Sequence, residues 1–330
     1  MIELNKRSVA TKTVEYRQYI KDDYNSYAIF CENNFGRNAY QIKRSYLEWL
    51  YDGTSKGFEV AVYSEKVIGI EHNIKAPVLI NNECTMVTVL HDLMVDENHR
   101  GTVGFRLMQD SLKRDNYLVL PGSVGRLSRT YGKLGSKKFA SFWYRKYQFP
   151  LNIFRRISPL KLLSLRKLAE RENLLFGHNK EANENFLKNS LKSYKDISQF
   201  LVYFKWRFFH KHSPLTFYVS DSDGENSALF VLGKRGKIPY ARIFYAQCKS
   251  DAIYRKIIKL IEKITSRIGV PVILHTSFEC APPNNFGYRV YADLPVSYVY
   301  SSTKKLEFEP IVPSFCSDIG FDGLNLLSDP

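Results

Sequence analysis

The sequence predicts an α/β protein with mixed sheets, organised as two domains in tandem. Its 330 residues are enough for two hydrophobic cores, and a chain with 44% hydrophobic and 14% aromatic residues is globular. Strand and helix patterns occur in one order in the first half and return in a similar order after residue 200. A turn with two glycines, Arg100 to Gly104, joins an apolar strand to an amphipathic helix.

Each first-half element follows from the spacing of its apolar residues. A strand has alternating or continuous apolar and β-branched residues, whereas a helix places its apolar residues three and four positions apart. The expected elements are a strand at 13–19, helices at 27–35 and 42–50, strands at 58–63, 67–74 and 84–95, a helix at 104–112, a strand at 117–120, a helix at 123–134 and a strand at 137–147.

The turn that begins at Arg100 is suited to bind a phosphate group. Gly101 and Gly104 let the backbone turn sharply and approach a ligand closely. The first amides of the helix that follows have no partner inside the helix, and the positive end of the helix dipole favours an anion there. The spacing fits neither Gly-x-x-x-x-Gly-Lys-Ser/Thr nor Gly-x-Gly-x-x-Gly. An ordinary strand-to-helix turn is the alternative interpretation.

The second half is predicted to repeat the first behind a charged connector. Strands are expected at 215–220, 228–233, 238–247, 270–275 and 290–301, with a helix at 251–268. The strand-to-helix turn Cys248-Lys249-Ser250 has neither glycine nor arginine, so we expect no phosphate site there. The predicted divisions are a first domain at 1–150, a connector at 151–199 and a degenerate second domain at 200–330.

The first half resembles the GNAT superfamily of acyl-coenzyme A N-acyltransferases, in its order of elements and in two motifs. The GNAT phosphate motif is Arg/Gln-x-x-Gly-x-Gly/Ala after a hydrophobic strand. Arg100 matches its first position, whereas Val103 and Phe105 replace the small residues, with Gly104 between them. The segment Ser128-x-x-Tyr131-x-Lys133-Leu134-Gly135 resembles the motif in which a tyrosine reaches the coenzyme A sulfur. The two-domain arrangement resembles peptidyltransferases of the Fem type.

The resemblance implies an acyl-coenzyme A donor, with its diphosphate on the turn. Backbone amides of Met94 and Val95 are the candidates for binding the carbonyl oxygen of the thioester. The full set of residues expected to bind the donor is Leu93, Met94, Val95, Arg100, Gly101, Thr102, Val103, Gly104, Phe105 and Ser128.

Amide formation from an ammonium group requires a base, donors for the carbonyl oxygen and an acid for the leaving thiolate. Strand alternation places Asp92 and Met94 on one face. The resemblance implies an acidic residue at this point of the strand, acting as the base directly or through water. Asp92 is therefore the expected base and its neighbour His91 the alternative; for either, the other interpretation is a side chain hydrogen-bonded to an adjacent strand. Tyr131 is the expected acid, and the alternative for it is an aromatic side chain packed under its helix. The resemblance implies that Phe35, Asn38, Trp49 and His72 lie in the elements that wall the acceptor, and the alternative for most of the aromatic residues there is packing in the core.

Composition limits the class of protein further. A net charge of +15 favours a polyanionic partner, but no nucleic-acid-binding signature accompanies it, so we expect a phosphorylated substrate and not nucleic acid. Five dispersed cysteines indicate reduced thiols in the cytoplasm, and neither cysteines nor histidines have the spacing of a metal site. The polar start of the chain and the absence of a long apolar run predict neither a leader peptide nor a membrane span. The oligomeric state is left open.

Two-domain GNAT proteins of bacterial surface-polysaccharide gene clusters, which include lipopolysaccharide O-antigen clusters, give the most specific resemblance. It implies acyl transfer to the amino group of a nucleotide-linked amino-deoxysugar, as in the dTDP-3-amino-3,6-dideoxyhexose N-acyltransferases. Two alternatives stay open. One is a Fem-like transferase that uses an aminoacyl-tRNA, and the other is a non-catalytic module that binds nucleotides or polyanions.

Overall fold

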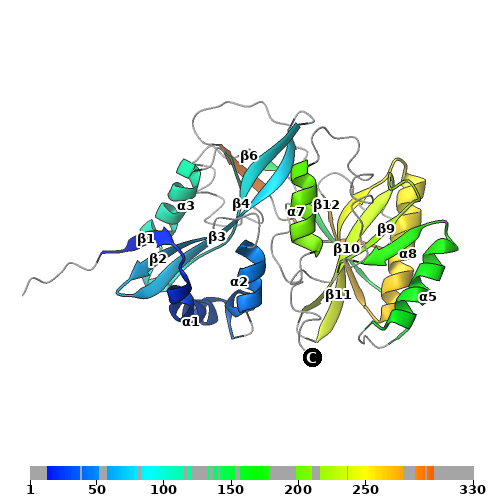
Figure 1. Cartoon of the computed structure of the whole chain (residues 1–330), viewed down its shortest axis with the longest axis horizontal. Helices are drawn as coiled ribbons and strands as arrows, with labels where there is room; N and C mark the ends of the chain where they lie inside the picture. The colour runs from blue at the N-terminus through cyan, green and yellow to red at the C-terminus, as the bar shows by residue number, and fades with distance from the viewer. Residues whose placement is uncertain are drawn as a thin grey trace, which may run out of the picture.

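The computed structural model describes residues 13–37, 39–51, 58–80, 83–114, 117–120, 129, 133, 137–139, 142–152, 157–178, 198–209, 216–235, 237–277, 287–293 and 296–300. Within these residues the strands form two seven-stranded sheets, which lie in two lobes beside each other (Figure 1). The prediction of an α/β protein with mixed sheets is confirmed.

The first sheet has the strand order β1-β2-β3-β4-β5-β14-β6. All neighbouring strands described in it are antiparallel except β4 and β5, which are parallel. Its strands are β1 (Glu15–Gln18), β2 (Glu59–Tyr63), β3 (Lys66–Ile80), β4 (Glu83–Val95), β5 (Tyr117–Leu120), β6 (Lys137–Phe139) and β14 (Val296–Tyr300). Its helices are α1 (Tyr24–Phe35), α2 (Arg44–Tyr51) and α3 (Thr102–Arg114), with short 3-10 turns at Lys21–Asp23, Tyr40–Ile42 and Glu97–His99.

The second sheet has the order β13-β7-β12-β11-β10-β9-β8, and again one described pair, β11 with β12, is parallel. Its strands are β7 (Phe142–Tyr147), β8 (Leu175–His178), β9 (Thr216–Ser220), β10 (Ser227–Arg235), β11 (Ile238–Gln247), β12 (Val272–Ser277) and β13 (Arg289–Asp293). The described helices of the second half are α5 (Pro159–Glu170), α7 (Ser198–Phe209) and α8 (Asp251–Ile268), of which α7 contacts β3 and β4 of the first sheet.

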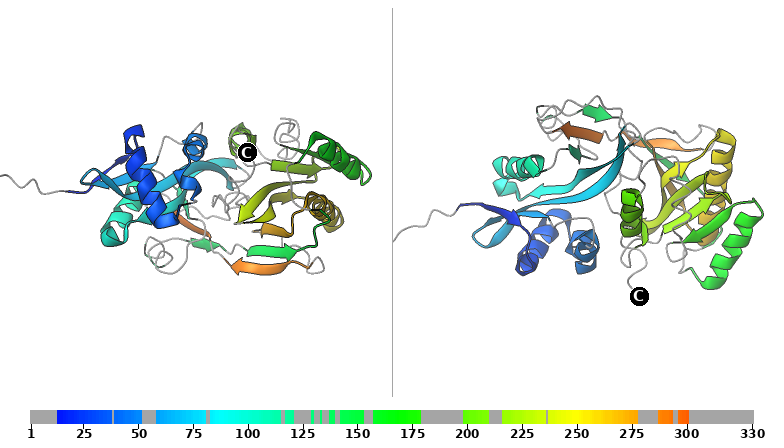
Figure 2. Two further views of the ribbon diagram at one scale, coloured as in Figure 1. Left: turned by 90° about the horizontal axis from the view of Figure 1, so that it is seen from below. Right: turned by 45° about the horizontal axis from the view of Figure 1, so that its top comes forward.

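The two sheets exchange one strand each. β7 comes from the first half of the chain but pairs with β12 and β13 of the second sheet. Reciprocally, β14 pairs with β5 and β6 of the first sheet, and Figure 2 shows the orange β13 and the darker β14 in different lobes. The single strands expected at 137–147 and 290–301 were therefore wrong, since each is two strands in different sheets. Apolar alternation cannot reveal this, because it continues across the change of sheet.

The halves correspond element by element. The two strand orders match when the second is read backwards, as β8-β9-β10-β11-β12-β7-β13. The exchanged strand, β14 in the first sheet and β7 in the second, is then the sixth strand of each. This correspondence assigns α5 and β8 to the second half, although residues 151–199 were expected to be a connector. Leu165 and Leu168 of α5 lie in the core that α8 covers, because they face inward one turn apart.

Helices cover both faces of the first sheet. α3 lies on one face, where Gly69 of β3 leaves room for the side chains of Val103 and Leu107; a Cβ at Gly69 would lie 3.3 Å from each. α1 and α2 lie on the other face, and α1 contacts β3. β4 ends between these layers, so the turn before α3 and the residues facing α1 and α2 meet at one end of the sheet.

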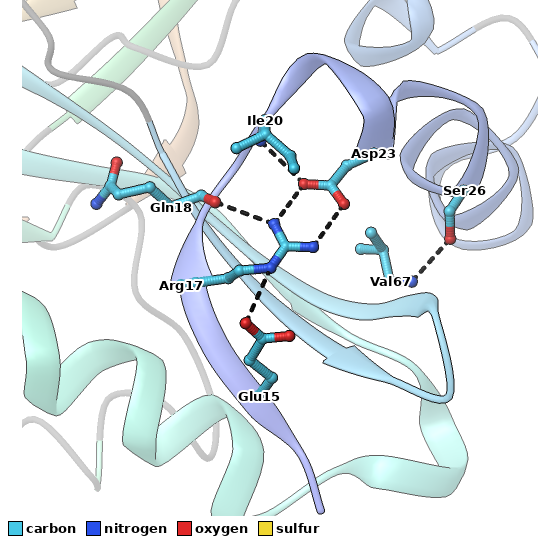
Figure 3. A network of polar contacts seen from close by, with 7 residues as sticks. All are labelled: Glu15, Arg17, Gln18, Ile20, Asp23, Ser26 and Val67. Atoms are coloured by element: carbon cyan, nitrogen blue, oxygen red, sulfur yellow. Dashed lines mark hydrogen bonds and ion pairs between the residues drawn. The ribbon is translucent and has the colours of Figure 1, made fainter.

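An ion pair joins β1 to the start of α1 (Figure 3). The guanidinium of Arg17 donates to both carboxylate oxygens of Asp23, with N···O distances of 2.6 and 2.8 Å. The same carboxylate accepts from the backbone N–H of Ile20 at 2.9 Å. These hydrogen bonds, led by those from Arg17, lower the pKa of Asp23. On α1 itself, the Ser26 hydroxyl accepts from the Val67 backbone N–H of β3, which seats the helix on the sheet.

Two tryptophans join the lobes. Trp49 of α2 and Trp206 of α7 stack with ring centroids 5.0 Å apart and planes at 10°. Each indole N–H donates to the backbone carbonyl of the other tryptophan, at 3.2 Å from Trp49 and 2.7 Å from Trp206. Each lies ten residues before the next strand, β2 or β9, so the two helices occupy corresponding places in the two halves. We call this contact the tryptophan seam.

Candidate functional site

The candidate site lies where β4 bulges. Ile70 pairs with Met94 and His72 pairs with His91, so one residue of β3 faces two residues of β4. The extra residue lets Asp92 adopt φ +50°, in the left-handed region that favours glycine. A left-handed non-glycine residue costs about 1–3 kcal/mol and is frequent at functional sites. The bulge turns Asp92 toward the face that carries α1 and α2.

His72 and Tyr46 contact the Asp92 carboxylate, and Tyr27 supports His72. His72 Nδ1 lies 3.1 Å from Asp92 Oδ2, and the Tyr46 hydroxyl donates to the same oxygen at 3.4 Å. Behind the imidazole, His72 Nε2 lies 3.2 Å from the Tyr27 hydroxyl, which also lies 3.0 Å from the carbonyl of Gln41. His72 is fully buried, whereas the Asp92 side chain keeps 14% of its surface exposed. The carboxylate is therefore the end of the chain of contacts that substrate can reach.

The ionisable side chains around Asp92 and His72 are held in their neutral forms by burial. Burial raises the pKa of Tyr27 and Tyr51 well above the usual value, and the negative charge of Asp92 adds to both shifts. Burial, with a smaller contribution from Asp92, raises the pKa of Cys31 to about 12. Near neutral pH these three groups are therefore protonated and carry no charge.

The turn before α3 has the features expected of an anion site. Gly101 has φ +104° with open space where a Cβ would point, and Arg100, Gly101 and Thr102 are exposed. The hydrogen bond from Phe105 N to Gly101 O starts the helical ladder, which leaves the amides before Phe105 without acceptors inside the helix. The first turn of α3 has no acidic residue. The nearest capping carboxylate, Asp96, accepts from the backbone N–H of Asn98.

The two departures from the GNAT motif have different environments. Val103 is buried and faces the sheet, where Gly69 makes room for it, so its side chain does not occupy the anion face. Phe105 is 41% exposed on the outer side of α3. Gly104 lies where a Cβ would approach a methyl group of Val95 to 3.3 Å, which explains the need for a small residue there.

The register of β3 and β4 distinguishes the two expected oxyanion donors. Asp96 N donates to Ile68 O, and hydrogen-bonded and non-hydrogen-bonded pairs alternate along antiparallel strands. The amide of Met94 therefore points toward Ile70 on β3, and that of Val95 points toward the β5 edge. The described pairs of β4 with β5 involve only Thr88 and Val89. Of the two amides, that of Val95 is therefore the one that faces the β5 edge. The side chains of Leu93 and Val95 pack with Val103 and Leu107 under α3.

The structure does not place every expected residue at a reachable surface. Trp49 and His72, expected on the acceptor wall, are fully buried, because one forms the tryptophan seam and the other supports Asp92. Phe35 is half-buried at the last position of α1. The backbone of His91 pairs with His72, but its side chain lies outside the described residues, as do Asn38, Ser128 and Tyr131.

Sequence reasoning missed Tyr27 and Tyr46. Both lie on helices, where a tyrosine at an inward position is the ordinary signature of core packing. The signal that could have found them is three polar-tipped aromatic residues, Tyr27, Tyr46 and His72, in elements around an expected base. Only the folded arrangement brings their polar atoms to Asp92.

The second half contains a counterpart of this site without its chemistry. β11 has a register shift that leaves Phe244 as the extra residue, three positions before the strand ends, as Asp92 is in β4. At the start of α8, Ser250 caps the amide of Ile253 and Asp251 places an acid in the first turn. The amide of Lys249 donates to the Asn226 side chain at 2.8 Å. An anion would meet occupied amides and negative charge there.

Scans against family models and searches of curated proteins found no match to this chain. Solved structures do match it. A GCN5-related N-acetyltransferase from Anabaena variabilis superposes with a TM-score of 0.57 at 12% identity, covering 87% of this chain and 72% of that one. A tandem GNAT protein from the clavulanic acid biosynthesis pathway gives 0.57 at 10%, covering 89% and 100%. A putative acetyltransferase from Pyrococcus horikoshii gives 0.53 at 11%, covering 92% and 95%.

At these identities the likeness shows the fold, and the prediction of two tandem GNAT-like domains is confirmed. Among the described helices, none is long and apolar enough to cross a membrane. Among the described residues, no cluster of three or more histidine, cysteine, aspartate or glutamate side chains could hold a metal ion.

Proposed function

We propose that the protein is an acyl-coenzyme A-dependent N-acyltransferase whose reaction takes place at the end of β4. The observation that carries this proposal is the position of Asp92, on a bulge three residues before the strand ends, just ahead of an exposed glycine turn at a helix N-terminus. The turn supplies amides and Arg100 for a diphosphate, and the bulge supplies a carboxylate for the amine. The tandem GNAT fold supports the same assignment.

The proposed chemistry is direct attack with no covalent enzyme intermediate. Asp92 takes one proton from the acceptor ammonium, and the amine nitrogen then bonds to the thioester carbonyl carbon. The Val95 amide donates to the carbonyl oxygen as it gains charge. The carbon–sulfur bond breaks, and the sulfur leaves with the electron pair and takes a proton from Tyr131. The nitrogen's second proton restores Tyr131 through solvent, and Asp92 releases its proton, so the products are an amide, a free thiol and one proton.

For the acceptor, we propose the amino group of a nucleotide-linked amino-deoxysugar, such as a dTDP-3-amino-3,6-dideoxyhexose, in surface-polysaccharide synthesis. The net charge of +15 supports two phosphorylated substrates. The carboxylate of Asp92 would attract the ammonium group of such a sugar. The same charge also suits an aminoacyl-tRNA donor, which predicts RNA binding that weakens steeply with salt.

Thiol release tests the proposal. The protein is mixed with acetyl-coenzyme A and a dTDP-amino sugar, and free thiol is measured against reactions without acceptor. Asp92→Asn is the matched variant, because asparagine tolerates a left-handed φ but is not a base. We expect thiol release from the wild type, a loss of at least about 100-fold in Asp92→Asn, and equal binding of acetyl-coenzyme A by both. No binding of acetyl-coenzyme A at millimolar concentration would overturn the proposal.

A further inference from the structure

The contacts behind Asp92 extend the proposed function to a residue that never meets substrate. His72 has no exposed surface, and both of its ring nitrogens lie within hydrogen-bond distance of a partner. Three aromatic rings enclose the imidazole, with Phe58 edge-on at 4.6 Å and 90°, and the rings of Tyr27 and Tyr46 about 6 Å away, at 5.9 and 6.1 Å. The imidazole plane is therefore fixed by packing before any hydrogen bond is considered.

The available protons determine the direction of the hydrogen bond between His72 Nδ1 and Asp92 Oδ2. Tyr27 has one hydroxyl proton and three polar neighbours: His72 Nε2, the carbonyl of Gln41 and the Cys31 thiol. If that proton goes to His72, the neutral imidazole carries its own proton on Nδ1. If it goes to Gln41, His72 donates from Nε2 to the tyrosine oxygen, and with an ionised Asp92 it also donates from Nδ1. An ionised Asp92 carboxylate can only accept, so its contact with Nδ1 places a proton on Nδ1 whichever way the Tyr27 hydroxyl points.

We propose that His72 is the positioning residue for the base: its Nδ1–H holds Asp92 Oδ2 on the bulge and keeps the carboxylate ionised until it receives the proton of the acceptor amine. Tyr27 fixes the imidazole from behind, and Tyr46 steadies the same carboxylate oxygen. The arrangement reverses the usual order of a catalytic triad, because the carboxylate faces the substrate and the imidazole supports it. This inference rests on the proposed acyl transfer.

Among the residues whose side chains are described, those that face the pair and can titrate are Tyr27 and Cys31 from α1 and Tyr46 and Tyr51 from α2. α7 also packs on β3 and β4, and its Lys205 is exposed. A shift of the pH profile between variants at position 72 therefore reports on the Asp92–His72 pair, because every other ionisable group is common to those variants.

Two substitutions at one position separate positioning from packing. His72→Asn keeps a donor near the place of Nδ1 and loses the contact with Tyr27. His72→Gln reaches toward Tyr27 and loses the donor to Asp92. We expect His72→Gln to lower kcat by about 10²-fold or more, a size typical of acid–base groups, and to move the acidic limb of kcat/KM to higher pH, because a carboxylate without its donor has a higher pKa. His72→Asn should recover most of kcat and the wild-type limb, and KM for acyl-coenzyme A should stay unchanged in both.

A second measurement does not depend on activity. In protein labelled with ¹⁵N histidine, we expect His72 to show a proton on Nδ1 from pH 6 to pH 9. Equal kcat losses in the two variants with an unshifted acidic limb, or an unprotonated Nδ1, would overturn the positioning role. If the wild type transfers no acyl group while Nδ1 is protonated, the proposed function fails and the hydrogen-bonded pair stands.

Discussion

The tryptophan seam should contribute measurably to stability, and Trp206→Phe is the perturbation that tests it. The indole N–H of Trp206 donates to Trp49 O at 2.7 Å, and both side chains are at most 5% exposed. Phenylalanine can still stack on Trp49, but it has no donor. The substitution therefore removes one buried hydrogen bond while it keeps most of the ring contact.

The expected loss can be worked from these contacts. Leaving the buried carbonyl of Trp49 without its donor costs about 1–3 kcal/mol. The smaller ring also buries less apolar surface and leaves unfilled volume, which adds about 1 kcal/mol. We expect Trp206→Phe to lower the free energy of unfolding by about 2–4 kcal/mol. Trp49→Phe should cost somewhat less, because its hydrogen bond is longer, at 3.2 Å.

Urea unfolding followed by far-ultraviolet circular dichroism measures this loss. The denaturant midpoint should fall while the slope of the transition stays unchanged, because β7 and β14 still tie the two sheets together. Val202→Ala on the same helix is the control, since Val202 is 56% exposed and should change stability by at most about 0.5 kcal/mol. If Trp206→Phe is as mild as Val202→Ala, the seam is not the buried contact described here.

Three further outcomes follow from the structure. Gly101→Ala should destabilise the fold by about 1–3 kcal/mol through its φ of +104°, despite the open space around it, and should weaken acetyl-coenzyme A binding measured by calorimetry. Arg17 lowers the pKa of Asp23, so the stability from this pair is present above pH 4 and is lost as the pH falls through the lowered pKa; acid titration of Asp23→Asn should lack that loss. With a pKa of about 12, Cys31 should resist a disulfide reagent at pH 8 while the half-buried Cys248 reacts, as mass spectrometry of labelled peptides would show.

Local patterns predicted the bounds of several elements. The helix over 251–268 has the predicted bounds, because its isoleucines recur at helical spacing and Ser250 and Gly269 mark its ends. The strands at 117–120 and 238–247 also match. The exposed turn at Arg100 and Gly101 and the facing of Asp92 were predicted from the same kind of local evidence.

The misplaced elements and residues share a different cause. β7 could pair with either sheet. Its partner strand, β12, lies over 100 residues later in the chain, and an alternation pattern does not encode such a distant pairing. Trp49 and His72 carry polar atoms that suit an acceptor wall. Instead, Trp49 hydrogen-bonds to Trp206, and His72 contacts Asp92.

By itself, the amino-acid sequence determined that the chain is a tandem α/β protein with a glycine turn at one helix start and none at its counterpart, since periodicity and backbone freedom are local properties. Tertiary structure alone decided the strand exchange, the tryptophan seam and the support that His72, Tyr27 and Tyr46 give to Asp92. The physical reason is that a buried polar group requires a partner at hydrogen-bond distance, and only folding brings such partners together from distant parts of the chain.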